Sequence, residues 1–123
     1  MILVDTSVWV HHLRHGVKHL EELLLAGEVL MHPFIEGELA CGSLKNREQI
    51  LRLLGHLPRA TLAEHGEALG LLERARLFAI GIGWIDAHLL ASAMLSDSPL
   101  WSQDRPLEAV AGRLKVGYSP LGG

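Results

Sequence analysis

Two aspartates follow short apolar runs at positions where a parallel sheet would bring them to one edge. Asp5 comes directly after residues 2–4, Ile-Leu-Val, and Asp104 comes two residues after the run 100–102, Leu-Trp-Ser. Short apolar runs of this kind predict strands that are buried on both faces. Ligands of open parallel sheets bind beyond the carboxyl ends of the strands, so both aspartates are placed for chemistry. Each could instead be only the cap of the helix that follows it.

Two further carboxylates lie in predicted helices. The segment 33–42 contains Glu36 and Glu38. At about 100° per residue, Glu38 falls inside the apolar arc of this helix, close to Phe34, and Glu36 falls on the opposite side. A charge in the middle of an apolar face is costly unless a partner compensates it. We therefore expect Glu38 to point toward the core and Glu36 to be an ordinary solvated residue.

Asp86 presents the same pattern in the helix predicted for residues 84–95. It falls between Leu89 and Leu90 on the apolar face, whereas His88 falls off that face and is expected at the surface or rim. A carboxylate in the first turn of a helix is favoured by the helix dipole, which explains the position of Asp86 along the helix but not its direction. Asp86 is therefore the fourth carboxylate expected at the sheet edge.

Four carboxylates at one sheet edge predict a site for a hard divalent cation. Two carboxylates ~4 Å apart repel by roughly 4 kcal/mol at an effective dielectric constant of ~20, so a fold rarely gathers four without compensation. Oxygen ligands without cysteine or a histidine set favour Mg²⁺, with Mn²⁺ as the other candidate. A divalent ion activates water and stabilises charge on a phosphate, which would give this cluster a purpose in phosphoryl chemistry.

Composition restricts the class of protein. The chain has 123 residues, 49% of them hydrophobic, and a formal net charge of −3. Such a charge is unusual for a protein that binds nucleic acid by charge alone, so any nucleic-acid binding needs a local basic patch, a bound cation or an oligomer. No apolar run reaches the ~18 residues of a membrane span. Asp5 and His11 interrupt any signal peptide, and the single cysteine, Cys41, suits a reducing compartment, so we expect a cytoplasmic protein.

Predicted strands and helices alternate along the chain. This alternation is typical of a mainly parallel sheet with helices on both faces, here in one domain of residues 1–123 with a frayed tail at 119–123. The predicted strands are 2–4, 28–32, a weak 60–62, 100–102 and 114–116. The predicted helices are 6–15, 17–26, 33–41, a helix capped by Asn46 that runs through Leu54, 64–80, 84–95 and 105–111.

The motifs resemble those of the PIN-domain nucleases, and in particular the VapC-type toxins of toxin–antitoxin pairs. The resemblance spans nearly the whole chain through MILVDTSVW, FIEGELACG, GIGWIDAHLLASA, and LWSQD before a proline. It implies that Asp5, Glu38, Asp86 and Asp104 correspond to the metal-binding acidic residues of the family. Ser7 resembles the hydroxyl residue that supports the first aspartate. Ser102 stands where the family often has threonine, a departure that keeps the hydroxyl group.

The resemblance also implies a three-layer α/β/α fold, Mg²⁺-dependent endoribonuclease activity, a homodimer and inhibition by a cognate antitoxin. In this interpretation Asp5, Asp86 and Asp104 hold the ion or ions, and Glu38 binds metal or orients the attacking water. The water displaces the 3′ oxygen of an RNA phosphodiester and leaves a 5′ phosphate.

Three other classes were weighed. Haloacid-dehalogenase phosphatases require a second aspartate two residues after the first, where this chain has Ser7. Response-regulator receiver domains need an adjacent acidic pair and a lysine that do not stand out here. A degenerate PIN domain that only binds a partner stays open, although all four acids are present.

Other side chains were considered for metal or RNA binding. The run of His11, His15 and His19 has a spacing that could hold zinc, but Gly16 interrupts it and a solvated helical face is favoured. Trp9 and Trp101 are expected in the core, with base stacking as the alternative. The candidates for contact with RNA phosphate are Arg14, Lys45, Arg47 and Arg105.

Overall fold

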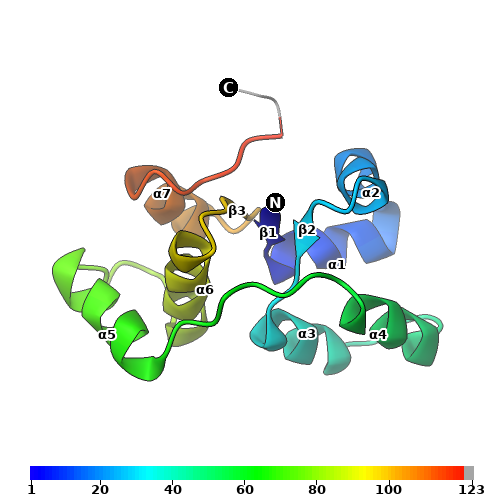
Figure 1. The fold of residues 1–123 in the computed structure, drawn as a ribbon, viewed down its shortest axis with the longest axis horizontal. Helices are drawn as coiled ribbons and strands as arrows, with labels where there is room; N and C mark the ends of the chain where they lie inside the picture. Colours follow the sequence, from blue (N-terminus) through cyan, green and yellow to red (C-terminus); the bar gives the residue numbers. More distant parts are fainter. Residues whose placement is uncertain (121–123) are drawn as a thin grey trace.

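The computed structural model describes residues 1–120, and a three-stranded parallel sheet lies at its centre (Figure 1). Its strands are β1 (Ile2–Val4), β2 (Val29–Leu30) and β3 (Leu100–Trp101), in the order β2-β1-β3. Both neighbours pair with β1 in parallel, and Leu3 is opposite Leu30 on one side and Leu100 on the other. β1 is therefore the central strand, and the residue that follows it emerges in the middle of the sheet edge.

Helices surround the sheet. Figure 1 shows α5, α6 and α7 around β3, and α1 to α4 around β2. The described helices are α1 (Thr6–His15), α2 (Lys18–Leu25), α3 (Pro33–Ala40), α4 (Arg47–Gly55), α5 (His65–Arg74), α6 (Trp84–Leu95) and α7 (Arg105–Arg113). The predicted three-layer α/β/α class with a parallel sheet is confirmed, and the helices predicted at 6–15 and 84–95 match residue for residue. None of the described helices could cross a membrane, because none is both long and apolar enough.

The core includes the central strand β1 and the middle of α6, a helix that packs against α5 and β3. Leu3 and Val4 are fully buried, and every residue of α6 from 87 to 93 is buried. Trp9 and Trp101 are also buried, which confirms their predicted place in the core. Because α6 is enclosed on all sides, its apolar residues do not mark a single face.

Two predicted strands are wrong. Residues 60–62 and 114–116 form no strand, and only the adjoining residues Arg59 and Gly117 make isolated parallel bridges, to Met31 and Leu100 respectively. Neither segment runs alongside its neighbour for more than one residue, so no ladder of hydrogen bonds forms. Asn46 occupies the predicted cap position of α4, but with φ 54° and without a side-chain capping hydrogen bond.

The predicted long helix 64–80 ends early, because α5 stops at Arg74. Arg76 adopts φ 54°, and the N–H of Leu77 donates to the carbonyl of Leu72 at 3.0 Å. A left-handed residue followed by this longer hydrogen bond is the usual way to end a helix. The position is normally glycine, and since arginine occupies it here, the sequence carries no stop signal. Of the predicted frayed tail, Ser119 and Pro120 are exposed and 121–123 lie outside the described residues.

Candidate functional site

Asp5 ends the central strand and begins the next helix. Its N–H donates to the carbonyl of Trp101 at 2.8 Å, which continues the pairing of β1 with β3. Its Oδ2 accepts hydrogen bonds from the hydroxyl of Ser7 at 2.7 Å and from the hydroxyl of Ser102 at 2.9 Å. The backbone N–H of Ser7 also donates to Oδ2, so Asp5 is the cap residue of α1. Asp5 is only 6% exposed, and these donors compensate its burial.

The same two serines connect this carboxylate to the loop between β3 and α7. The hydroxyl of Ser102 accepts from the N–H of Asp104 at 3.0 Å, and the hydroxyl of Ser7 accepts from the N–H of Gln103 at 2.9 Å. Asp104 in turn caps α7, since its Oδ2 accepts from the N–H of Leu107 at 3.1 Å. The predicted supporting role of both serines therefore has a geometric basis, because they connect the residues after β1 and β3.

Glu38 reaches the same region from α3, but not as predicted. Its side chain is exposed, and its Oε1 accepts a 2.7 Å hydrogen bond from the hydroxyl of Thr6. The prediction that Glu38 points into the core is wrong. Glu36, predicted to be solvated, is half-buried and forms a 2.9 Å ion pair with Arg59.

The buried face predicted from the helical periodicity is wrong because α3 buries only a narrow face. Only Ile35 and Leu39 are buried in this helix. Phe34 is 38% exposed and Cys41 is exposed as well, so the wide apolar arc drawn from the sequence is not the buried face. Burial of two side chains four positions apart is enough to hold a short helix against the core. Glu38 is thereby left at the surface, within reach of the residues that follow β1.

Asp86 approaches from the first turn of α6. Its Oδ2 accepts a 2.9 Å hydrogen bond from the N–H of Gly83, a capping contact that accompanies its predicted first-turn position. Burial raises the pKa of the Asp86 carboxyl, and the charges of Asp5, Asp104 and Glu38 raise this pKa further, against the opposing effect of the Gly83 hydrogen bond. All four carboxylates therefore share one electrostatic neighbourhood.

The predicted location of His88 is wrong, since this residue is 7% exposed. Its ring lies edge-on between those of Phe34 and Trp84. The helical phase could not place His88 because α6 is buried all round.

Each of the four carboxylates has one oxygen held and one available. The held oxygens are those bonded to Ser7 and Ser102, Thr6, Gly83 and Leu107. Within residues 1–120, no donor reaches the second oxygen of any of them. As the side chains stand in residues 1–120, no three acidic, histidine or cysteine residues lie close enough together to hold a metal ion.

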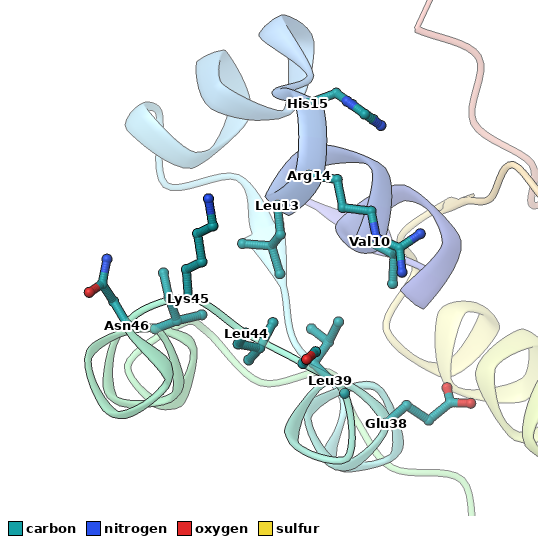
Figure 2. Close-up of a pocket in the computed structure, with 12 residues that line it drawn as sticks. Val10, Leu13, Arg14, His15, Glu38, Leu39, Leu44, Lys45 and Asn46 are labelled. Carbon is teal, nitrogen blue, oxygen red and sulfur yellow. The ribbon is translucent and has the colours of Figure 1, made fainter.

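Two of the predicted phosphate-binding residues line the same groove as Glu38. Arg14 and Lys45 line a groove of about 540 Å³ together with Glu38. Figure 2 shows Arg14 extending from α1 on the side of Glu38, with Lys45 at the opposite side. Arg47 instead donates to the carbonyl of Ala40 at 2.8 Å. Arg105 is exposed at the start of α7, next to Asp104 in the chain.

Several residues of the site were not predicted as parts of it. Thr6 positions Glu38, and Gly83 positions Asp86. Gln103 bonds to the ring of His11 at 3.0 Å, so His11 belongs to this edge, while His19 bonds to Tyr118. The position of Thr6 next to Asp5 in the chain was the signal that could have indicated its place in the site. Nothing in the sequence indicates that Gln103 contacts His11, which is 92 residues away.

Comparison with known proteins agrees with the fold and the motifs. The family model of the PIN domain matches residues 2–113. The chain belongs to the PIN domain family. Two PIN-domain relatives, both named Ribonuclease VapC32, come from the Mycobacterium tuberculosis strains CDC 1551 / Oshkosh and ATCC 25618 / H37Rv. Each is 46% identical to this chain over 120 residues, 97% of both chains. The resemblance to VapC-type PIN proteins is thereby confirmed.

Replacing Asp86 by asparagine should raise the melting temperature at pH 7 in EDTA. The folded pKa of Asp86 is raised, so this carboxyl contributes stability at low pH and loses it as the pH rises through the folded pKa. Asparagine keeps an acceptor for the N–H of Gly83 and removes the charge. Thermal melts at several pH values check this, and the advantage of Asp86→Asn should shrink toward low pH.

The matched control is Glu108→Gln, which removes a first-turn charge from α7. A negative charge near a helix N-terminus is favourable, so this variant should melt at or below the parent. An Asp86→Asn variant that also melts below the parent at pH 7 would contradict mutual repulsion among the carboxylates.

Proposed function

We propose that this PIN domain is a Mg²⁺-dependent endoribonuclease, and that it is the toxin of a type II toxin–antitoxin pair. The observation that carries the proposal is the gathering of Asp5, Glu38, Asp86 and Asp104 into one electrostatic neighbourhood. The 46% identity to Ribonuclease VapC32 over almost the whole chain supports RNA as the substrate and an antitoxin as the partner. Mn²⁺ is the alternative ion.

The donor set fits a hard cation. Four carboxylates, each with one oxygen fixed by a hydrogen bond and one unbonded, offer the ligands that Mg²⁺ prefers. Burial raises the pKa of Asp86 most, and the charges of Asp5, Asp104 and Glu38, which a divalent ion would neutralise, raise this pKa further. Asp5, Asp86 and Asp104 would hold the ion or ions. When bound, the ion supplies activation of water and stabilisation of charge on the phosphate.

The remaining work falls to the residues of the chain. Ser7 and Ser102 both donate to Oδ2 of Asp5, which leaves Oδ1 without a hydrogen bond in residues 1–120. Glu38 is exposed and held through one oxygen by Thr6, which leaves Oε2 to orient the attacking water and accept its proton. The water displaces the 3′ oxygen and leaves a 5′ phosphate. Arg14, Lys45 and Arg105 are placed to contact neighbouring phosphates, whereas Arg47 would first have to leave Ala40.

Cleavage should require Glu38 and a divalent ion but not Glu36. Glu38→Gln removes the charge beside the other acids and should lower the rate of RNA cleavage by about 100-fold or more, as loss of a general base typically does. Glu36 lies on the same helix as Glu38, and Glu36→Gln alters only its ion pair with Arg59. This variant should therefore retain most of the activity. The measurement is cleavage of a labelled single-stranded RNA with Mg²⁺, Mn²⁺ or EDTA.

Equal losses in the two glutamine variants would show that Glu38 has no special role. Full cleavage in EDTA by a pure preparation, abolished by neither variant, would overturn the metal-dependent mechanism. A protein that binds RNA or a partner but never cleaves would instead support the degenerate PIN domain, the second candidate.

The groove beside Glu38 suits an amphipathic antitoxin segment. Its walls combine Val10 and Leu13 of α1 with Leu39 of α3 and Leu44 of the following loop (Figure 2). Because one end of the groove is formed by Glu38, a segment that fills it could place an arginine or lysine among the four carboxylates. Such recognition of an amphipathic element by an apolar groove is common.

Mg²⁺ should therefore weaken the complex with the antitoxin, because the ion and the inserted cation would compete for the same oxygens. Calorimetric titration of the antitoxin into the protein at rising Mg²⁺ checks this, with Na⁺ at matched ionic strength as the control. An affinity that responds to ionic strength alone would place the inhibitory contact elsewhere.

The other properties that the family resemblance implies belong to the same proposal. We place the protein in the cytoplasm, where its single cysteine would stay reduced. We also propose that residues 1–123 form one domain and that two copies associate as a homodimer. The exposed apolar side chains on α5, such as Leu69, are consistent with such an association.

A further inference from the structure

A row of five aromatic rings joins the helices that carry two of the carboxylates. His32 precedes α3 and Phe34 lies in it, His88 and Trp84 lie in α6, and His65 begins α5. Successive ring centroids are 5.0, 5.1, 4.6 and 5.0 Å apart along the row from His32 to His65. The row therefore spans the space between the first turns of α3 and α6.

The buried middle of this row holds its exposed members in place. His88 is 7% exposed and meets Phe34 at 74° and Trp84 at 88°, the edge-to-face arrangement that aromatic pairs favour. The N–H of Phe34 also donates to Nδ1 of His32 at 3.0 Å. Phe34 and Trp84 are thus both held against the buried ring of His88.

Phe34 and Trp84 also lie next to the carboxylates along their helices. Phe34 is one turn before Glu38 on α3, so both side chains share one side of that helix. Trp84 is two residues before Asp86 in the first turn of α6. The two aromatic side chains are 38% and 39% exposed, which leaves ring surface open to solvent beside the acidic cluster.

Charge decides which part of an RNA could bind here. A phosphate beside four carboxylates is repelled unless a cation lies between them, whereas a nucleobase is neutral and presents a π face. Stacking of bases on aromatic rings is the usual way that proteins hold single-stranded nucleic acid independently of charge. From this placement we propose that Phe34 and Trp84 form a stacking subsite for an unpaired nucleobase adjacent to the scissile phosphate. The subsite rests on the proposed ribonuclease function and adds a specificity element to it.

Tryptophan fluorescence can report on this subsite directly. The chain has three tryptophans; Trp9 and Trp101 are 2% and 4% exposed, so Trp84 is the exposed one. The full-length Asp5→Asn protein would be titrated with a short single-stranded oligoribonucleotide and with an abasic sugar–phosphate oligomer of the same length. The oligoribonucleotide should quench the Trp84 emission, and the abasic oligomer should not.

Kinetics of the active protein give an independent measurement. Trp84→Leu should lower kcat/KM for RNA about 10-fold. This factor corresponds to ~1.4 kcal/mol, which is within the range lost when one stacked base loses its aromatic partner. Trp84→Phe should restore most of it, because it keeps an aromatic face. Leu95→Ala is the control, since Leu95 is 45% exposed on the same helix but lies at its far end. Circular dichroism would show that each variant is folded.

Two results would overturn the proposal. One is equal quenching by the abasic oligomer together with an unchanged kcat/KM for Trp84→Leu. The other is a Trp84 emission that shifts with protein concentration in the absence of RNA, with Trp84→Leu dissociating the dimer, which would assign the rings to a second copy of the chain. Base-dependent quenching without any cleavage by the parent would refute the ribonuclease function and leave the base-binding site standing.

Discussion

The buried carboxylate of Asp5 is the constraint on which the rest of the site depends. It ends the central strand of a three-stranded parallel sheet, where it is almost removed from water. An unpaired charge in such a position would be very costly, and the hydroxyl groups of Ser7 and Ser102 provide the compensation. Because one serine comes from α1 and the other follows β3, satisfying this one charge also fixes how three elements meet.

The caps of three helices and the candidate metal ligands are the same residues. Asp5 and Asp104 are the cap residues of α1 and α7, and Asp86 accepts the capping hydrogen bond of α6. Capping uses one oxygen of each carboxylate and fixes the direction of the other. A structural role therefore does not compete with a functional one here. Capping alone does not explain why the carboxylates are grouped. The charges of Asp5, Asp104 and Glu38 all add to the effect of burial in raising the pKa of Asp86.

The sequence predicted best what depends on strand order. An aspartate after each of two parallel neighbours must emerge at the same edge, so Asp5 and Asp104 could be placed without side-chain detail. The sequence predicted least well what depends on how much of a helix is buried. In α3 only an i, i+4 pair is buried, and Glu38 is exposed. In α6 every residue from 87 to 93 is buried, and this stretch includes His88.

Contacts made by single residues were also beyond prediction. The end of α5 depends on Arg76 in a left-handed conformation, for which glycine is the recognisable signal. The row of rings that joins α3 and α6 depends on Phe34 and Trp84, from separate parts of the chain, both meeting the ring of His88. Such contacts follow from packing between elements and leave no periodicity in the sequence.

The central claim is that the four carboxylates form one cation site, and Mn²⁺ titration followed by NMR tests it most directly. The paramagnetic ion broadens the backbone amide signals of residues close to it. The predicted result is that the signals of Asp5, Glu38, Asp86 and Asp104 broaden together at low Mn²⁺, and that Asp5→Asn removes this common response. Broadening centred on Glu36, or on exposed acids of α2 such as Glu21, with the signal of Asp5 left sharp, would contradict the account.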